Sequence, residues 1–325
     1  MAAQSIGQGL TLLYPLPEET ETESPSTVKV FRESIIFIHG LGGGPQKTWK
    51  YFDTVQQDIT ADSEPGKKKS WRARLKNKSP NTSGSASGSK AIYWSADLLP
   101  SAVPMAKIWT YGYNANVVGG SFQNINKNGI LQHGNDFMVK VERGLKNDLP
   151  IIFVAHGLGG LVVKRSMKRM QSDLNPRYKQ LLHRIQAVVF CGTPHRGSDT
   201  AARVGLVINL VAMAFMDTHS KLLSDLRVDS KILDLIQEDF MKLLYERPIR
   251  IHSFQEGRGL TGVKGLHNKV VDDFSSKLGW PRETLETIDA DHREMVKKLG
   301  VKDISDVLTA LEEELVKDSQ KSETG

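Results

Sequence analysis

The stretch that decides the fold is Pro150-Ile-Ile-Phe-Val-Ala-His-Gly-Leu-Gly-Gly160. Its first six residues are almost continuously apolar, which is typical of a strand that is covered on both faces of a sheet. Residues 158–167 then repeat apolar side chains at helical spacing. The stretch therefore predicts a buried strand, a sharp glycine-containing turn and a helix, in that order.

The same strand character recurs along the chain and predicts a parallel sheet. Four further apolar or β-branched runs are expected to be strands, at residues 34–39, 107–111, 186–191 and 249–254. Helical patterns lie between them, and 130–149 and 304–316 are the clearest. Residues 9–14 and 27–31 are expected to add antiparallel edge strands. This alternation predicts one α/β domain over residues 1–325, with a mostly parallel central sheet and helices on both faces.

Composition excludes several protein classes. The chain has 325 residues, of which 39% are hydrophobic and 25% are charged, as expected for a soluble globular protein. Its one cysteine, Cys191, excludes a disulfide scaffold and favours a reducing compartment, so we expect a cytoplasmic protein. We expect no secretory signal, and the longest apolar run, residues 204–216, is shorter than the roughly 20 residues that span a bilayer.

The positive charge of the chain is concentrated in one segment. The net charge is +6, and residues 66–90 contain eight lysines and arginines and no acidic residue. Subtracting those eight charges leaves −2 for the rest of the chain, so we expect no nucleic-acid partner. We interpret residues 62–90, which end in a Ser/Gly-rich stretch, as a flexible surface loop, with a peripheral membrane contact as the alternative.

Two further segments are expected to lie outside the sheet. Residues 199–246 are expected to form a long helical insertion between the fourth and fifth predicted strands, either as a cap over a pocket or as buried packing helices. Residues 317–325 are polar and are expected to be a disordered tail. The sequence does not define an oligomeric state.

The turn after the predicted strand at 150–155 is the position where hydrolases of the α/β class place the nucleophile motif G-x-S-x-G. The central residue here is Gly157, not serine. The backbone N–H of the next residue, Leu158, is a candidate oxyanion donor. The context therefore matches a nucleophile turn, while the reacting hydroxyl is missing.

The other parts of such a site follow in the expected chain order. A glycine-rich loop, His39-Gly-Leu-Gly-Gly-Gly44, follows the first core strand, and the N–H of Leu41 is the second candidate oxyanion donor. Glu256 follows the fifth predicted strand, where the acid belongs. His292 precedes the last predicted helix, where the general base belongs. Asp272 and Asp273 remain alternatives to Glu256 as the acid.

Several motifs together resemble one protein family. Residues 9–300 are similar to lipase-related serine hydrolase domains of the "serine active site containing protein" type. The motifs that carry the resemblance are Phe37-Ile-His-Gly-Leu-Gly-Gly43 with Trp49, Trp94-Ser-Ala-Asp-Leu-Leu-Pro100, Ile108-Trp-Thr-Tyr-Gly-Tyr-Asn114, Ala155-His-Gly-Leu-Gly-Gly-Leu161, Gly192-Thr-Pro-His-Arg-Gly-Ser198 and Asp291-His292. The resemblance implies an α/β-hydrolase fold and hydrolysis of a hydrophobic ester, thioester or amide, without a cofactor or metal.

The chain departs from the family pattern A-H-S-L-G-G at Gly157. Natural loss of the serine and its deliberate replacement would both give this sequence. Three functions stay open: a serine hydrolase without its nucleophile, an enzyme that uses His292 as a general base without covalent catalysis, and a binding or signalling module that keeps the pocket. The small-molecule or lipid-like acyl substrate is expected to lie near the following residues: His39, Gly40, Gly42, His156 and His195.

Overall fold

The computed structural model covers the whole chain and describes residues 7–15, 32–53, 90–115, 127–195, 230–260, 269–299, 302–311 and 313. The chain divides into two compact units. One consists of Met1–Lys50 and Tyr93–Gly325, and the other is Tyr51–Ile92. The smaller unit includes the greater part of a two-stranded sheet, β3 (Lys50–Asp53) with β4 (Lys90–Tyr93). Most of the predicted basic loop, residues 62–89, lies outside the described residues, as does the predicted tail.

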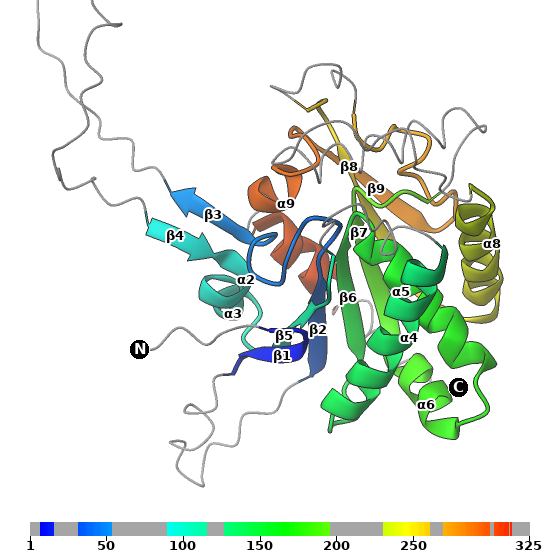
Figure 1. The fold of residues 1–325 in the computed structure, drawn as a ribbon. Coiled ribbons are helices and arrows are strands. Elements are labelled where there is room, and N and C mark those ends of the chain that lie inside the picture. Colours follow the sequence, from blue (N-terminus) through cyan, green and yellow to red (C-terminus); the bar gives the residue numbers. More distant parts are fainter. Residues whose placement is uncertain are drawn as a thin grey trace, which may run out of the picture. The chain divides into compact units, whose positions relative to one another are not determined.

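The larger unit is built on a seven-stranded sheet with the order β1-β5-β2-β6-β7-β8-β9 (Figure 1). β1 pairs antiparallel with β5, and all other neighbours pair in parallel. The strands are β1 (Gly9–Tyr14), β2 (Glu33–Ile38), β5 (Ala106–Gly112), β6 (Ile151–His156), β7 (Ile185–Cys191), β8 (Arg250–Glu256) and β9 (Glu283–Ile288). Because the central strands are parallel, their carboxyl ends meet at one edge of the sheet.

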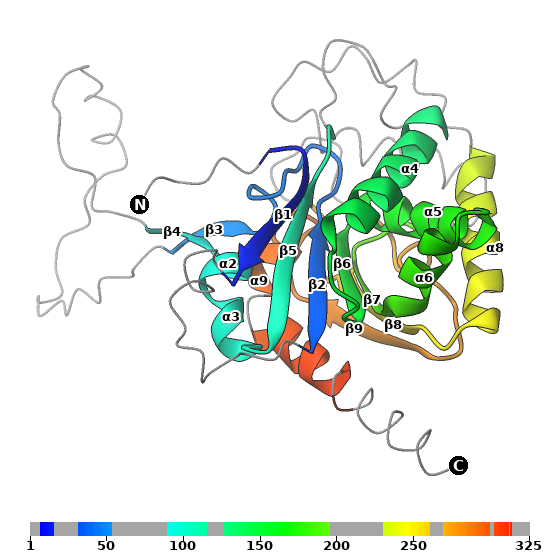
Figure 2. The ribbon, with the colours of Figure 1, turned by 90° about the horizontal axis from the view of Figure 1, so that it is seen from below.

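The central strands are apolar because helices cover both faces of the sheet. Every residue of β2 and β6 is buried. Figure 2 shows one group of helices on one face: α4 (Lys127–Gly144), α5 (Gly159–Ser172), α6 (Pro176–Arg184) and α8 (Ser230–Glu246). The other face carries α2 (Trp94–Asp97), α3 (Leu99–Ala102), α9 (Met295–Lys298) and the helical residues 302–311. This arrangement confirms the predicted α/β-hydrolase fold class.

Element boundaries differ from the sequence predictions in several places. Helix α4 ends at Gly144 rather than at Leu149, because residues 145–150 form the irregular approach to β6. Of the predicted insertion, residues 230–246 form α8, which packs on α5, and residues 199–229 lie outside the described part of the chain. The predicted strand at 27–31 also lies outside it. The sequence did not predict β9, whose residues are mostly exposed.

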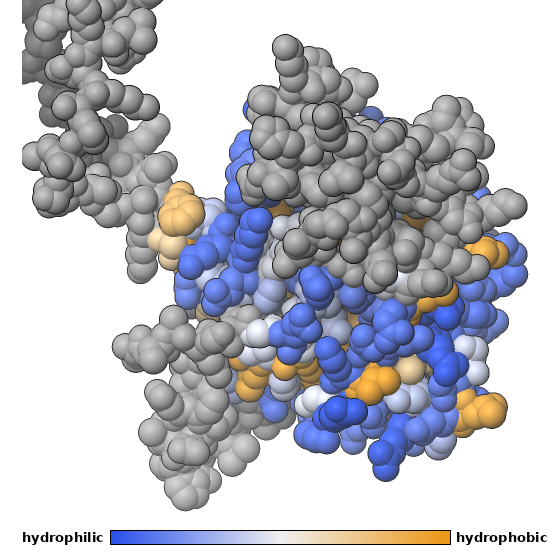
Figure 3. Space-filling model, in the orientation of Figure 1, coloured by the Kyte–Doolittle hydropathy of each residue, from blue (hydrophilic) through white to orange (hydrophobic). Residues whose placement is uncertain are grey.

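The core is one apolar cluster between the sheet and its helices. It joins side chains of β2, β6 and β7 with those of α4, α5 and α8, including Phe137, Phe153, Phe190 and Phe240. On the face drawn in Figure 3, the described surface is mainly hydrophilic, with separate hydrophobic patches. Among the described residues, no helix is both long enough and apolar enough to cross a membrane.

Candidate active site

The turn after β6 places Gly157 in a left-handed backbone conformation. The φ angle of Gly157 is +52°, which a residue without a Cβ atom adopts at little cost. Its N–H donates to the carbonyl of Cys191 at the end of β7, 2.9 Å away. Helix α5 begins two residues later. The predicted strand, turn and helix are therefore present, with glycine at the tip of the turn.

The imidazole of His292 lies next to this turn. It follows β9 in the sequence, and its side chain is only 1% exposed. A Cβ atom built on residue 157 would lie 3.1 Å from Nε2 of His292 and 3.6 Å from Cε1. A hydroxyl carried by that Cβ would be within hydrogen-bonding reach of Nε2. The structure thus brings the predicted nucleophile position and the predicted base together.

Glu256 holds the other nitrogen of the imidazole. The Nδ1 atom of His292 donates to Oε1 of Glu256, 2.7 Å away, and the Glu256 side chain is fully buried. The same carboxylate accepts the backbone N–H groups of Val270 (2.9 Å) and Val271 (2.8 Å). Three donors therefore satisfy a carboxylate that burial would otherwise penalise. Carboxylate and imidazole form a fixed pair.

The two aspartates that were alternatives to Glu256 have other partners. Asp272 accepts the N–H groups of Phe274 and Ser275, both at 2.9 Å, and so stabilises its own turn. Asp273 is exposed and pairs with Lys269. In the structure, Glu256 binds His292, whereas both aspartates bind groups of their own loop.

A second left-handed glycine shapes the space around the imidazole. Gly192, at the end of β7, has a φ angle of +55°. A Cβ built there would lie 2.9 Å from Nδ1 of His292 and 2.9 Å from the sulfur of Met295. His292 therefore sits in a slot, defined here by Gly157 and Gly192, that exists because neither residue has a side chain.

The glycine-rich loop after β2 approaches this turn closely. A Cβ on Gly40 would lie 2.9 Å from the carbonyl oxygen of His156, so only glycine fits there without a shift. The N–H of Gly42 donates to the carbonyl of Ala115. By contrast, the N–H groups of Leu41 and Leu158 have no hydrogen-bond partner among the described residues, and both residues are buried. Two unpaired donors thus flank the turn.

His39 supports this loop as a neutral ring. Its Nδ1 donates to the carbonyl of Gly40 at 3.0 Å, and its Nε2 accepts the N–H of Tyr113 at 3.3 Å. The ring stacks on Tyr113 with centroids 4.4 Å apart. Burial lowers the pKa of His39 to about 4, so the ring carries no charge near pH 7. His39 is fully engaged in holding the loop.

His156 and His195 lie beside the same edge of the sheet. The Nε2 of His156 donates to the carbonyl of His292 at 2.9 Å, and its ring centroid is 4.5 Å from that of His292. Burial and the nearby His292 lower the pKa of His156 well below 6.5. His195 is fully buried, packs edge-on against Phe190, and donates its backbone N–H to the backbone carbonyl of Ser275. Of the five predicted pocket residues, His156 thus contacts His292 directly, and His195 packs against Phe190 of β7.

No described side chain replaces the missing nucleophile at this turn. Burial raises the pKa of the Cys191 thiol, which therefore stays protonated inside the sheet. Ser166 is buried in α5, where its hydroxyl donates to the carbonyl of Val163. Ser121 and Ser198 lie outside the described residues. The described part of the chain also contains no group of three or more histidine, cysteine, aspartate or glutamate residues placed to hold a metal ion.

Three groups in the site escaped sequence reasoning. The N–H groups of Val270 and Val271 act through the backbone, so their side chains gave no signal. Gly192 enters the sequence prediction only as part of the motif Gly-Thr-Pro-His-Arg-Gly. The arrangement of parallel strands offers a signal, because Gly192 directly follows β7, which is next to β6 in the sheet.

Comparison with protein families gives a match over part of the chain. Residues 115–241 match the family described as "Putative serine esterase (DUF676)". The matched residues contain Gly157 and Leu158 but end before Glu256 and His292. The match supports a hydrolase-type domain.

Curated relatives extend the similarity to most of the chain. Protein SERAC1 of Bos taurus is 23% identical over 288 residues, which is 88% of this chain and 38% of that protein. Protein SERAC1 of Danio rerio is 23% identical over 301 residues, 90% of this chain and 39% of that protein. The chain thus spans about two fifths of the length of these relatives.

Solved structures of lipases are similar at lower identity. A lipase of Bacillus licheniformis, BlEst2, has a TM-score of 0.45 and 14% identity, covering 90% of this chain and 95% of that one. A monoglyceride lipase of Saccharomyces cerevisiae has a TM-score of 0.44 and 11% identity, covering 86% of this chain and 87% of that one.

Proposed function

We propose that this chain is a hydrolase-type domain that binds an ester, thioester or amide of a hydrophobic acid at the turn after β6. The observation that carries the proposal is the continuous line from Glu256 through His292 to the position of a side chain on residue 157. Its two distances are 2.7 Å and 3.1 Å. A pure binding module has no need for a buried imidazole that is oriented by a carboxylate and aimed at an empty backbone position.

His292 is the general base of the proposed site. Glu256 accepts the proton-bearing Nδ1, which leaves Nε2 as the basic nitrogen. The carboxylate stabilises the imidazolium that forms when Nε2 takes a proton. Since both side chains are buried, water competes little with this interaction.

Leu41 and Leu158 supply the oxyanion donors. Their N–H groups lack partners within the described chain, and an unpaired buried donor costs on the order of 1–3 kcal/mol. A negatively charged acyl oxygen would satisfy both. Such donors favour the tetrahedral intermediate over the planar ester, and each is worth roughly a hundredfold or more in rate.

Gly157 removes the covalent step from the proposed reaction. In this chain, Nε2 of His292 takes a proton from a water molecule, the resulting hydroxide attacks the acyl carbon, and the alcohol, thiol or amine leaves with that proton. Loss of a serine nucleophile removes on the order of a millionfold in rate, while the oxyanion donors and substrate binding keep part of the acceleration. We therefore propose slow turnover without an acyl-enzyme.

The proposal of a hydrophobic acyl group rests on the amino-acid sequence of a segment outside the described residues. Residues 204–216 form the longest apolar run of the sequence and follow β7 along the chain. An apolar acyl chain is the ligand that such a segment favours. The description of the matching family, "Putative serine esterase", agrees with ester chemistry, and the printed names of the relatives state no activity or substrate.

Replacement of Gly157 by serine tests the proposal. We expect the Gly157→Ser variant to bind a fluorophosphonate covalently and to hydrolyse p-nitrophenyl butyrate and octanoate far faster than the parent chain. The parent should show no labelling. Gly157→Ser/His292→Ala should lose both gains, because the hydroxyl then has no base.

The activity of the parent chain distinguishes direct attack by water from a binding module without turnover. If it hydrolyses these esters slowly and His292→Ala abolishes that activity, direct attack by water is supported. If Gly157→Ser folds, by circular dichroism and thermal melting, yet gains neither labelling nor activity, the proposed site is wrong. A parent that binds an acyl ligand with no turnover in either variant is a binding module.

A further inference from the structure

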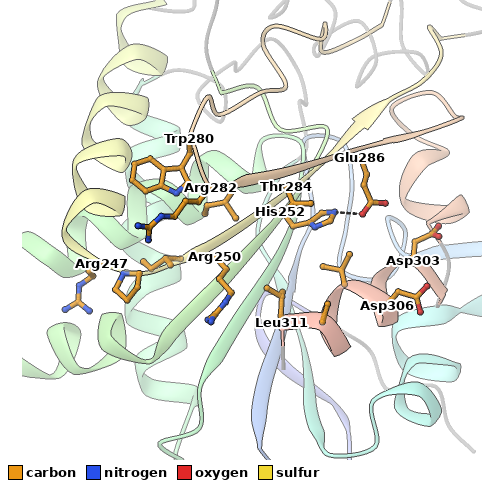
Figure 4. Close-up of a pocket in the computed structure, with 15 residues that line it drawn as sticks. Arg247, Arg250, His252, Trp280, Arg282, Thr284, Glu286, Asp303, Asp306 and Leu311 are labelled. Atoms are coloured by element: carbon orange, nitrogen blue, oxygen red, sulfur yellow. Dashed lines mark ion pairs between the residues drawn. The ribbon is translucent and has the colours of Figure 1, made fainter. Parts of the chain in front are cut away.

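A cavity of about 590 Å³ opens at the start of β8 and β9. Figure 4 shows it between these strands and the helical residues 302–311. Small-molecule sites typically have volumes of about 300–1,000 Å³. His252 lines the cavity, whereas Glu256 comes at the other end of β8, roughly 13 Å further along the strand. The cavity is therefore separate from the candidate active site.

Opposite charges lie at the two ends of this cavity (Figure 4). One end has arginines: Arg250 and Arg282, with Arg247 beyond them. The other end has carboxylates, namely Glu286, Asp303 and Asp306. The apolar side chains of Val307 and Leu311 also line the cavity, from the helix that covers it. The lining thus fits a molecule with two different charged ends and an apolar middle.

The acidic end has more negative charge than the described chain neutralises. Burial, and then the nearby carboxylates of Glu286 and Asp306, raise the pKa of Asp303. Neither Asp303 nor Asp306 forms an ion pair with any residue that the structure describes. The described residues also offer no three-ligand group for a metal ion. An organic ammonium group is the cation that this end fits.

A buried ring nitrogen points to the same ligand group. His252 is 7% exposed, and its Nε2 has no hydrogen-bond partner in the described structure. The closest acceptor, Oε1 of Glu286, is 3.2 Å away, but the orientation does not allow a hydrogen bond. Burial lowers the pKa of His252 to about 4, so the ring is neutral near pH 7 and this contact is not an ion pair. An ammonium N–H can donate to this nitrogen.

We propose that this cavity binds an elongated dipolar small molecule, with an anionic group at the arginine end, an ammonium group at the acidic end and an apolar chain between them. A simple anion would leave Asp303 and Asp306 without an ion-pair partner among the described residues, and a simple amine would make no contact with the arginine end. Carboxylate and phosphate share the chemistry that guanidinium groups recognise. The dipolar arrangement satisfies both ends.

A set of matched probes tests the proposal on the full chain. ω-Aminooctanoate has both charges, octanoate has only the anion, and octylamine has only the cation. By titration calorimetry, we expect the dipolar probe to bind at least about tenfold more tightly than either single-charge probe. ω-Aminooctyl phosphate, compared with ω-aminooctanoate, identifies which anionic group is preferred.

Two substitutions test which end of the cavity binds which charged group of the ligand. Arg282→Gln should remove most of the advantage of ω-aminooctanoate over octylamine and leave its advantage over octanoate. Asp303→Asn should do the reverse. Arg177→Gln, on α6, and Asp148→Asn, in the loop before β6, are exposed positions outside the cavity lining; these matched controls should bind like the parent.

Three results would overturn the proposal. These are no binding of ω-aminooctanoate at millimolar concentration, equal binding of all three probes, and unchanged binding in the Arg282→Gln/Asp303→Asn double variant. The Gly157→Ser variant should bind the probes like the parent, so this test succeeds or fails independently of the proposed hydrolase site.

Discussion

Lys164 is almost completely buried, and its Nζ donates to the side-chain oxygen of Gln237, 2.7 Å away. Lys164 lies on α5, which follows Gly157, and Gln237 lies on α8. The Nε2 of Gln237 in turn donates to the carbonyl of Leu278, 2.7 Å away. Leu278 belongs to the same loop as Val270 and Val271. A partly buried polar bridge therefore connects the helix after the turn with the loop whose N–H groups bind Glu256.

The contributions of Lys164 and Gln237 to the free energy of unfolding should depend on each other. Gln237→Leu leaves the buried ammonium of Lys164 without this acceptor and should lower the free energy of unfolding by about 3 kcal/mol. The double variant Lys164→Met/Gln237→Leu should be clearly more stable than the sum of the two single effects, because it removes the buried ammonium together with its acceptor. Urea denaturation of the four proteins measures the difference. Glu238→Gln, in an exposed pair with Lys242, is the control and should hardly change the midpoint.

A side chain at residue 157 should cost stability. Gly157→Ala places a Cβ in the left-handed region and 3.1 Å from His292, so we expect a loss of about 1–2 kcal/mol. Gly44→Ala is the matched control, since its nearest neighbour, the Cβ of Lys47, is 3.8 Å away, an ordinary contact. Unfolding midpoints in urea should separate the two variants. Equal losses would contradict a strained turn.

Acid should destabilise the protein through His39. Because the folded-state pKa of about 4 lies below the ordinary value of 6.5, the unfolded chain binds the extra proton first. The stabilisation from the neutral ring is complete above about pH 6.5 and decreases as the pH falls toward 4. The loss is on the order of 3 kcal/mol. His156 and His252 act in the same direction.

The measurement is the free energy of unfolding of the parent and of His39→Gln at several pH values. The variant should show a shallower decrease between pH 6.5 and 4, by about one proton, and no difference in slope above pH 7. Parallel slopes through the acid range would show that His39 does not titrate this way.

The acid of the proposed site can be separated from its neighbours in the Gly157→Ser protein. Glu256→Gln should lower kcat for ester hydrolysis by roughly a thousandfold or more, since the imidazole loses the carboxylate that orients and stabilises it. Asp273→Asn, whose carboxylate pairs with exposed Lys269, should keep nearly full kcat. If the aspartate variant is the inactive one, the assignment to Glu256 is wrong.

The sequence predicted those parts of the fold and candidate site that local patterns encode. The strand and turn at 150–157 were readable because a buried parallel strand is apolar throughout and is followed by glycines. The order of Gly157, Glu256 and His292 along the chain also predicted which groups meet, since the carboxyl ends of neighbouring parallel strands lie together.

The parts that escaped prediction depend on exposed strands, backbone groups or distant packing. Strand β9 is mostly exposed and has no apolar run, so its pattern resembles a loop. The amides of Val270 and Val271 carry no side-chain signature. The cavity beside His252 forms only where the helix at 302–311 covers β8 and β9, which no single segment encodes.

The slot between Gly157 and Gly192 bears on how this site could change over generations. Codons for glycine and serine can differ by one base, and the imidazole is already aligned toward position 157. Introduction of a hydroxyl there would require the imidazole to move by a few tenths of an ångström. A single base change could therefore place a hydroxyl next to the proposed general base.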